Sequence, residues 1–146
     1  MYTIHLMLNA KERIYIYTLL DVYSRWAFAI ATPKINTHQG VKFFELAAKS
    51  SPFRFNCIQS DHGPEFSQKF SERIKTIHRH SRVRRPNDNA HLERFNRTIQ
   101  EELIQKITLD VDQINLHLPA YLKYYNEQRL HLGINLNSPI QLLQSY

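Results

Sequence analysis

Three strand-like segments at the start of the chain predict a fold that contains a β-sheet. The central segment, Arg13–Leu20 (RIYIYTLL), is rich in β-branched and aromatic residues, a composition typical of a buried strand. Residues 2–8 alternate apolar and less apolar side chains, and residues 26–31 (WAFAIA) form a third apolar run. The connections, residues 9–12 and 21–25, are short and polar, so the three predicted strands are antiparallel neighbours.

A helix and a further strand follow this meander. Residues 38–49 carry apolar side chains on one helical face, and residues 53–59 form a short strand that leads straight to Asp61. Because a helix lies between them, this strand is predicted to run parallel to the first strand. The next segments predict a helix over residues 67–77 and a short fifth strand at residues 82–84.

Helical segments complete a single predicted domain. Residues 90–106 have an apolar stripe at helical spacing, and residues 111–129 and a short segment from Pro139 are also predicted to be helical. No repeat, linker or low-complexity tract divides the chain. The expected fold class is α/β, with a mixed five-stranded sheet (three antiparallel strands first) flanked by helices. It forms one domain over residues 1–146, with the C-terminal helices of about residues 108–146 packed on it.

Composition and charge favour a soluble protein with a polyanionic partner. The chain has 19 Lys and Arg against 13 Asp and Glu, a formal net charge of +6, which raises the expectation of nucleic acid binding. Cys57 is the single cysteine, so no internal disulfide is expected, and a reducing, cytoplasmic location follows, on the nucleoid when DNA is bound. No apolar window is long enough to span a bilayer, so no membrane partner is expected.

Asp61 is the first candidate site residue. It stands at the carboxyl end of its predicted strand, within the sequence Ser-Asp-His-Gly-Pro-Glu-Phe. Loops at this end of the strands of an α/β sheet are the usual place for a functional site. An isolated Asp in such a loop more often caps a turn. The surrounding residues favour a functional role over that alternative.

Glu93 is the second candidate, one turn into the helix predicted from Ala90. Asn89, Arg97 and Gln100 share its helical face, away from the apolar stripe. If this face is simply solvated, it holds an exposed Glu93–Arg97 pair worth only about 0.3–0.5 kcal/mol. If it is functional, Glu93 binds a metal ion while Arg97 and Gln100 extend along nucleic acid.

A basic tract lies between the two acids. On a strand, Arg82 and Arg84 would point to one face, and Arg85 follows them directly. A solvated surface is one interpretation, and contact with DNA phosphates is favoured because of the position between the acids. The predicted DNA-binding residues are Arg82, Arg84, Arg85, Asn89, Arg97 and Gln100.

Paired carboxylates suit phosphodiester chemistry. Two Mg²⁺ ions about 3.5–4 Å apart can activate the attacking oxygen and stabilise the leaving one, and such hard cations take oxygen ligands. Two carboxylates do not easily hold two ions, so a third acid is normally required. The eight histidines match no common zinc-finger spacing, and zinc is not expected.

The chain resembles the catalytic core of the integrase and D,D-E transposase family, especially bacterial insertion-sequence transposases and retroviral integrases. The matching stretches are LLDVYSRWAFAI, SDHGPEF, RRPNDNAHLERFNRTIQEEL and YYNEQRLHLGINLNSPIQLL, which occur in the family's order. The resemblance implies an RNase H-like fold, DNA strand cleavage or strand transfer in transposition and integration, and Mg²⁺ or Mn²⁺ as cofactor. It implies Asp61 and Glu93 as the second and third catalytic acids. The implied partners are transposon-end and target DNA, further copies of the chain, or a full-length transposase.

Two features depart from the family pattern. The family's first acid lies just ahead of a run similar to Thr3-Ile4-His5-Leu6, where this chain has Met1 and Tyr2. A neutral phenol is a poor Mg²⁺ ligand, so we expect that the first Asp is replaced or lost upstream of Met1, in a truncated core with much reduced activity. The interval from Asp61 to Glu93 is also somewhat short.

Other acids fit loop roles from sequence alone. Asp21 is expected to cap a turn, and Glu65 and Asp88 each suit a loop position. Three functions therefore stay open. The first is a transposase or integrase core that acts on phosphodiesters through Asp61, Glu93 and metal. The second is a degenerate module that binds DNA or pairs with a transposase without catalysis. The third is a structural nucleic-acid-binding protein with an RNase H-like fold and no role in transposition.

Overall fold

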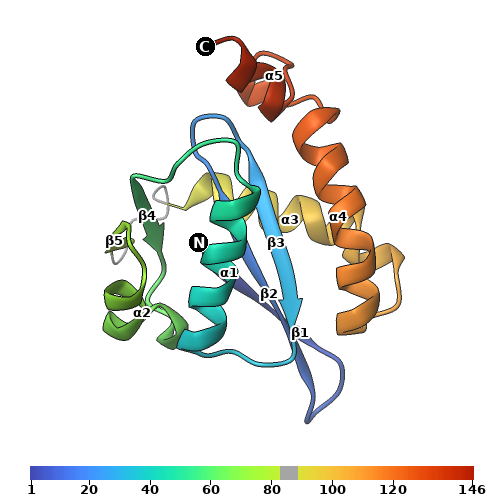
Figure 1. The fold of residues 1–146 in the computed structure, drawn as a ribbon. Helices are drawn as coiled ribbons and strands as arrows, with labels where there is room; N and C mark the ends of the chain where they lie inside the picture. The colour runs from blue at the N-terminus through green and yellow to red at the C-terminus, as the bar shows by residue number, and fades with distance from the viewer. Residues whose placement is uncertain (83–88) are drawn as a thin grey trace.

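The computed structural model describes residues 1–82 and 89–146. Its first three strands are β1 (Tyr2–Met7), β2 (Arg13–Leu20) and β3 (Ala27–Thr32), which form an antiparallel sheet in the order β1-β2-β3 (Figure 1). Cross-strand pairs such as Ile4 with Ile16 fix the register. The predicted antiparallel meander is confirmed.

The middle of the chain places a second, small sheet beside the first. Its elements are α1 (Thr37–Ser50), β4 (Cys57–Ser60), η1 (Pro64–Phe66), α2 (Gln68–Arg73) and β5 (Ile77–His80). β4 and β5 pair in parallel, with Cys57 opposite Ile77 and Ser60 opposite His80. β4 is short, and the residues that follow it form the loop that carries Asp61.

Two predicted boundaries in this region were wrong. The helix expected over residues 67–77 ends at Arg73, because Ile74 already has extended backbone angles (φ −90°, ψ 143°). The fifth strand lies at residues 77–80, earlier than the predicted residues 82–84, of which 83 and 84 lie outside the described part. Ile77 continued the helical spacing of Phe70 and Ile74, yet its side chain is 71% exposed, so that spacing did not reflect burial.

The five strands also divide differently from the single sheet that was expected. The structure has a three-stranded antiparallel sheet and a two-stranded parallel one. The predicted parallel partner of β4 was β1, but its ladder partner in the described chain is β5. β4 is linked to the start of β1 by a hydrogen bond from the Met1 amine to the Gln59 carbonyl. β4 is only four residues long, and its ladder is formed with β5.

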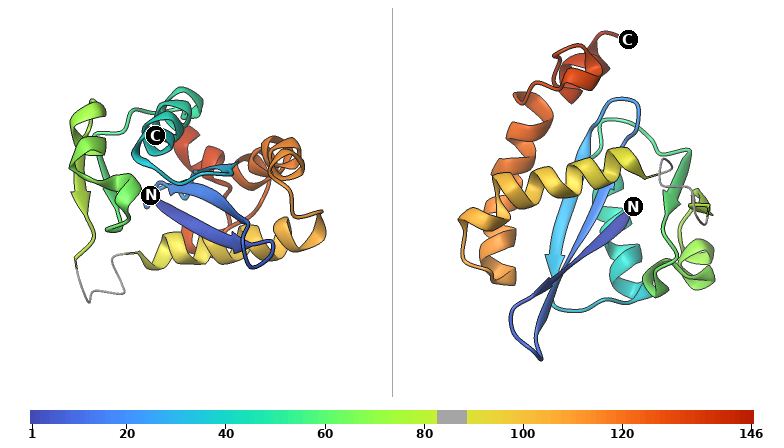
Figure 2. Two further views of the ribbon diagram at one scale, coloured as in Figure 1. Left: turned by 90° about the horizontal axis from the view of Figure 1, so that it is seen from below. Right: turned by 180° about the vertical axis from the view of Figure 1, so that it is seen from behind.

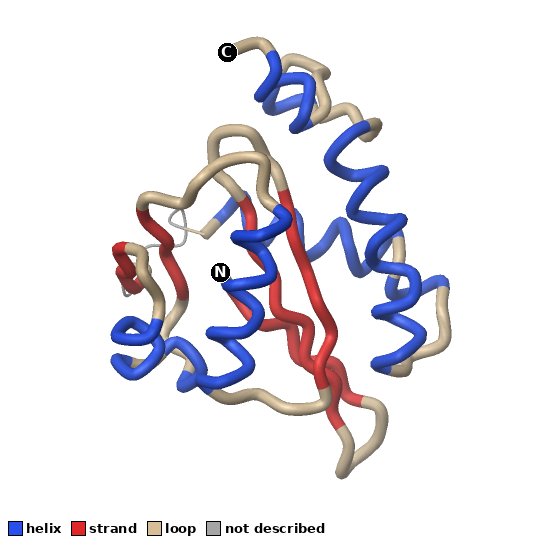
Figure 3. The backbone as a smooth tube through the Cα atoms, viewed as in Figure 1, coloured by secondary structure: helices blue, strands red, loops and turns tan. Residues whose placement is uncertain are grey.

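Helices cover both faces of the larger sheet. The second half of the chain forms α3 (Ala90–Glu102), η3 (Ile104–Lys106), α4 (Val111–Glu127), η4 (Leu132–Ile134) and α5 (Pro139–Gln144). Figure 2 shows the sheet between α1 on one side and α3 on the other, with α4 beside β3. The helix and strand layers are also distinguished in Figure 3. Within the described residues, no helix is both long and apolar enough to cross a membrane.

The central strand β2 contributes to a core on each face of the sheet. Successive side chains of a strand point to opposite faces, and on β2 both faces are buried from Ile16 to Leu19. Ile14 and Ile16 pack in the cluster with Phe95 and Ile99 of α3. On the other face, Tyr17 and Leu19 pack with a cluster that includes the α1 residues Val41, Phe43, Phe44 and Ala47. This double burial explains why the run RIYIYTLL is nearly continuous in its apolar character.

Two asparagines of α4 close the outer edge of β3. The Asn126 side chain accepts a hydrogen bond from the Ala27 amide (2.8 Å) and donates one to the Ala27 carbonyl (2.9 Å). Asn115 makes the same pair of bonds with Ala31, both at 2.9 Å. A side-chain amide presents one donor and one acceptor, as a backbone peptide does. The two asparagines therefore occupy the position of a neighbouring strand along part of this edge.

An ion pair fixes α4 relative to α3. Arg129 donates to both oxygens of Glu102, with its Nη2 2.7 Å from Oε1, and the Tyr121 hydroxyl also donates to Glu102 at 2.9 Å. Burial alone would raise the pKa of Glu102, but the hydrogen bonds from Arg129 and Tyr121 outweigh it, and the pKa lies below its usual range. The helix that carries Glu93 is thus tied to the C-terminal part of the fold.

Candidate active site

Asp61 lies at the carboxyl end of β4, as predicted, and two contacts hold it there. Its Oδ1 accepts a hydrogen bond from the Gly63 amide at 3.0 Å. On the backbone side, the ring of His80 on β5 lies with Nδ1 2.9 Å from the Asp61 carbonyl. The carboxylate therefore has one oxygen engaged in its own loop, which limits how the side chain can turn.

Glu93 lies in the first turn of α3, with an exposed side chain. Leu92, Phe95 and Ile99 are buried on the opposite side of the helix, which orients Glu93 away from the core. At the start of the helix, the Asn89 side chain accepts a hydrogen bond from Gln59 at 3.3 Å. Gln59 belongs to β4, so the strand that leads to Asp61 also holds the helix that presents Glu93.

Both acids act electrostatically on the start of β1. The pKa of the Tyr2 phenol is raised by burial and then by the negative charges of Asp61, Glu93 and Glu65. Carboxylates from the β4 loop and from α3 thus act on one side chain of β1, although 31 residues separate Asp61 from Glu93 (93 − 61 − 1). The assignment of Asp61 and Glu93 as the second and third catalytic acids stays a prediction.

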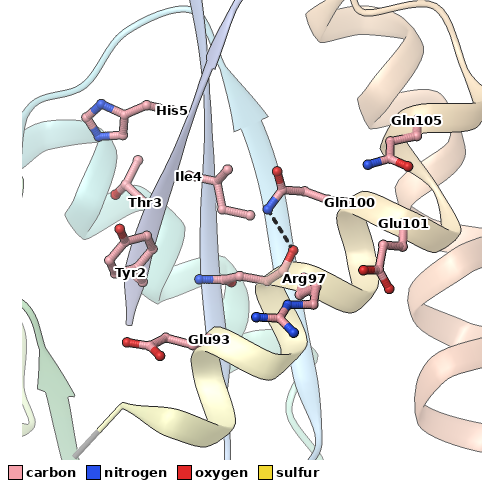
Figure 4. A pocket seen from close by; sticks show the side chains of 10 residues that line it. Tyr2, Thr3, Ile4, His5, Glu93, Arg97, Gln100, Glu101 and Gln105 are labelled. Carbon is pink, nitrogen blue, oxygen red and sulfur yellow. Dashed lines mark hydrogen bonds between the residues drawn. The ribbon is translucent and has the colours of Figure 1, made fainter. Parts of the chain in front are cut away.

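A cavity of about 600 Å³ opens between β1 and α3 (Figure 4). Glu93, Arg97 and Gln100 line its α3 side, and Gln100 donates a hydrogen bond to the Asn96 carbonyl at 3.0 Å. The other lining residues are Tyr2, Thr3, Ile4, His5, Asn96, Glu101 and Gln105. The cavity therefore joins one candidate metal ligand to a cationic and an amide side chain that can face a phosphate backbone.

The predicted DNA-binding residues divide between two cavities. Arg97 and Gln100 line the cavity beside Glu93. Arg82 and Asn89 line a second one of about 850 Å³, between β4–β5, the turn after β2 and the start of α3. The shared helical face predicted for Asn89 and Glu93 is thus split, because Asn89 turns toward Gln59 of β4. Arg84 and Arg85 lie outside the described residues.

The donor atoms of Asp61 and Glu93 suit a divalent hard cation. Both supply carboxylate oxygens, which Mg²⁺ and Mn²⁺ accept, and such ions commonly keep several water ligands. In the described part of the chain, no hydrogen bond or ion pair occupies the Glu93 carboxylate, and no group of three His, Cys, Asp or Glu side chains is placed to hold a metal ion. The residues present fit a cation bound by two carboxylates and water.

Buried polar residues beside the acids were not predicted. Asn96, one turn after Glu93, accepts a hydrogen bond from the Thr18 hydroxyl at 2.8 Å. Thr3 donates to Glu65 at 2.6 Å, and Glu65 is only 2% exposed. The sequence had assigned Glu65 a loop role. For Asn96, a polar residue beside the apolar stripe of its helix was the available sequence signal. The Thr3–Glu65 contact joins residues that are 62 apart in the chain, and no sequence signal indicates it.

His78 of β5 links the small sheet next to Asp61 to α2 through hydrogen bonds. The ring of His78 lies between Ser71 Oγ (2.6 Å from Nδ1) and Ser60 Oγ (2.8 Å from Nε2), and it packs edge-on against Phe70. Burial, together with the nearby His80, lowers the pKa of His78 to about 4 from an ordinary value of 6.5. The neutral ring is therefore the form that the fold selects.

Stability should consequently fall as the pH is lowered from 6.5 to 4. In that window the unfolded chain binds a proton at His78 that the folded chain excludes, so the contribution is complete above pH 6.5 and is lost toward pH 4. Urea unfolding at several pH values measures this. The variant His78→Gln should flatten the slope, while His117→Gln, at an exposed position of α4, should keep it. Equal slopes for His78→Gln and the unmodified chain would contradict the assignment.

Comparison with known proteins places this geometry in a family. Residues 2–86, more than half of the chain, match the integrase core domain, and residues 74–139 match a second family description of the integrase core domain. The ORF3 protein of Spiroplasma virus SpV1-C74, which bears the name of an integrase, is 24% identical over 158 residues. The transposase for insertion sequence element IS904 of Lactococcus lactis subsp. lactis (strain IL1403) is 25% identical over 134 residues.

These matches cover most of this chain and only part of the relatives. They include 94% of this chain and 44% of the Spiroplasma virus protein, and 86% of this chain and 53% of the IS904 transposase. The chain thus spans about half the length of the curated relatives it matches.

Solved structures share the fold. The HTLV-2 integrase catalytic core domain in complex with magnesium (trimeric form) has a TM-score of 0.73 at 19% identity, over 95% of this chain and 90% of that one. The catalytic core domain of BIV integrase has a TM-score of 0.70 at 16% identity, over 99% and 93%. A chain of the simian T-cell lymphotropic virus intasome, in complex with PP2A regulatory subunit B56 gamma, has a TM-score of 0.75 at 16% identity, over 97% and 52%. The predicted RNase H-like fold is confirmed, and the chain belongs to the integrase core domain family.

Proposed function

We propose that this chain is the core of a DNA integrase or transposase that cleaves and joins phosphodiester bonds with Mg²⁺ or Mn²⁺. The observation that carries the proposal is the hydrogen bond from Gln59 to Asn89, which ties the strand that leads to Asp61 to the start of the helix that presents Glu93. Both carboxylates also raise the pKa of Tyr2 at the start of β1. Membership of the integrase core domain family and the magnesium complex of the HTLV-2 catalytic core support it. DNA, transposon-end and target, is the proposed substrate.

In this proposal, the acidic side chains bind the cation and Arg97 contacts the DNA. Asp61 and Glu93 would hold the cation, which when bound supplies Lewis acidity for the attacking and leaving oxygens of a phosphodiester. The Gly63 amide keeps one oxygen of Asp61 in a fixed position. Arg97 lines the same cavity as Glu93 and is placed to neutralise a phosphate of the bound strand.

A cleavage and strand-transfer assay tests the proposal. The chain is incubated with labelled DNA carrying element ends, with and without Mn²⁺, and products are resolved by length. Cation-dependent products that disappear in Asp61→Asn support catalysis. DNA binding without products, in the unmodified chain, would instead support the alternative function of a DNA-binding or transposase-pairing module. Analytical ultracentrifugation with and without DNA would show whether copies of the chain associate, which we also propose.

DNA affinity should fall with rising salt, and Arg97→Gln should weaken that dependence. A side chain that neutralises one phosphate contributes a slope of about −0.9 in a plot of log affinity against log salt, so the variant should lose about one unit of slope. Fluorescence anisotropy with a labelled duplex at several salt concentrations measures both slopes. Arg54→Gln, at an exposed position before β4, is the matched control. An unchanged slope for Arg97→Gln would remove Arg97 from the interface.

A further inference from the structure

The Glu65 carboxylate is buried, and in the described part of the chain one of its two oxygens has no hydrogen-bond partner. Its side chain lies in η1, 2% exposed, and Oε1 accepts a hydrogen bond from the Thr3 hydroxyl at 2.6 Å. Among the described residues, Oε2 has no hydrogen-bond partner, and no ion pair involves Glu65. A buried carboxylate that serves only the fold is normally surrounded by donors or paired with a cation. Glu65 has neither arrangement.

The loop of Asp61 closes directly over this carboxylate. A Cβ atom placed on Gly63 would lie 2.5 Å from Oε2 of Glu65 and 2.7 Å from its Cδ, closer than real contacts allow. Gly63 is also the residue whose amide holds Asp61. Asp61, Gly63, Glu65 and Thr3 therefore form a continuous series of contacts from the candidate metal ligand to β1.

Three carboxylates on different elements act electrostatically on one side chain at the start of β1. Asp61, Glu93 and Glu65 all act on the Tyr2 phenol. Neighbouring carboxylates repel one another, and a divalent cation from solution would relieve that repulsion. The unpartnered Oε2 of Glu65 lies on the side of Gly63, facing the loop that carries Asp61.

We propose that Glu65 is a positioning residue behind the cation site, which raises the affinity of Asp61 and Glu93 for a divalent ion and fixes β1 beside them through Thr3. The inference rests on the proposed function, because it concerns the same cation. The acid in question lies on η1 and acts on the start of β1. Carboxylates behind metal ligands commonly change cation affinity without touching the ion.

The substitution Glu65→Gln separates this role from a purely structural one. Glutamine has the same shape and can still accept the Thr3 hydroxyl, but it carries no charge. In EDTA, the variant should be as stable as the unmodified chain or more so, because a buried charge with one donor has been removed. Its Mn²⁺ affinity should fall roughly tenfold, the lower end of the range for loss of a carboxylate behind the ligands. If Glu65 is merely structural, Glu65→Gln should instead lower the stability in EDTA and leave the Mn²⁺ affinity unchanged.

Calorimetric titration with Mn²⁺ and thermal unfolding in EDTA are measured for four proteins: the unmodified chain, Asp61→Asn, Glu65→Gln and Glu45→Gln, an exposed acid of α1. Weaker binding in Asp61→Asn and Glu65→Gln, with Glu45→Gln unchanged, supports the proposal. Weaker binding in Asp61→Asn alone overturns the role of Glu65 and leaves the proposed function standing. Failure of the unmodified chain to bind Mn²⁺ overturns both.

A second variant covers the case in which Glu65→Gln does not fold. Gly63→Ala keeps every charge, and its methyl group must displace the Glu65 carboxylate. Gly63 has φ −59°, so alanine fits its backbone. Mn²⁺ affinity should again fall, and unchanged affinity would overturn the proposal.

Discussion

Replacing Asp61 by Asn should reduce cation-dependent DNA cleavage and strand transfer by more than about 100-fold. Loss of a direct ligand should exceed the roughly 10–100-fold effect of losing a residue behind the ligands. The amide keeps the size of the side chain and still accepts the Gly63 hydrogen bond at the position of Oδ1, so the loop should retain its shape. Product formation with Mn²⁺ at saturating DNA concentration measures the effect.

Two controls define what this result means. Glu93→Gln should have an effect of similar size, because both acids are proposed to hold the same ion, whereas Glu45→Gln on the exposed face of α1 should leave the rate unchanged. Thermal unfolding of each variant shows that the fold is kept. Undiminished cleavage by Asp61→Asn would place the chemistry elsewhere in the molecule.

The largest loss of stability outside the apolar core is expected from Asn126→Leu. Leucine has nearly the shape of asparagine but leaves the Ala27 amide and carbonyl without their partners. Each buried backbone group without a partner costs about 1–3 kcal/mol, so the free energy of unfolding should fall by about 2–6 kcal/mol for the two groups. Chemical denaturation at neutral pH measures the change.

Gln113→Leu is the matched control for this experiment. It makes a comparable change from an amide to an aliphatic side chain on the same helix, at an exposed position. Its effect should stay within about 0.5 kcal/mol, as for most surface substitutions. If Asn126→Leu lowered the free energy of unfolding no more than Gln113→Leu does, water rather than Asn126 would have to hydrogen-bond the backbone of Ala27 at the edge of β3.

Local sequence patterns were sufficient for the features that depend on neighbours in the chain. The β-branched and aromatic residues of β2 predicted a buried strand, and the spacing around Glu93 predicted an acid in the first turn of a helix, on the face away from the apolar stripe. Both are observed. Asp61 at the end of a strand was predictable for the same reason. The resemblance to integrases added the expectation that these two acids meet.

Features that depend on distant partners could not be predicted. Nothing near Glu65 indicates that Thr3 will bind it, because 62 residues separate them. Asn126 reads as a polar residue in an amphipathic helix, and only the packed structure shows its bonds to Ala27, 99 residues away. The misplaced fifth strand has a local cause, since Ile77 fits a helical stripe and is nevertheless exposed.

The asparagine pairing between α4 and β3 sets a lower limit on the portion of the chain that can work alone. The two family matches meet around residues 74–86, which would suggest dividing the chain there. Such a division would separate an edge strand from the amides that cover it, and uncovered edges invite association between molecules. The smallest fragment that can present Asp61 therefore has to include α4, although α4 contributes no side chain to the described lining of the cavity beside Glu93.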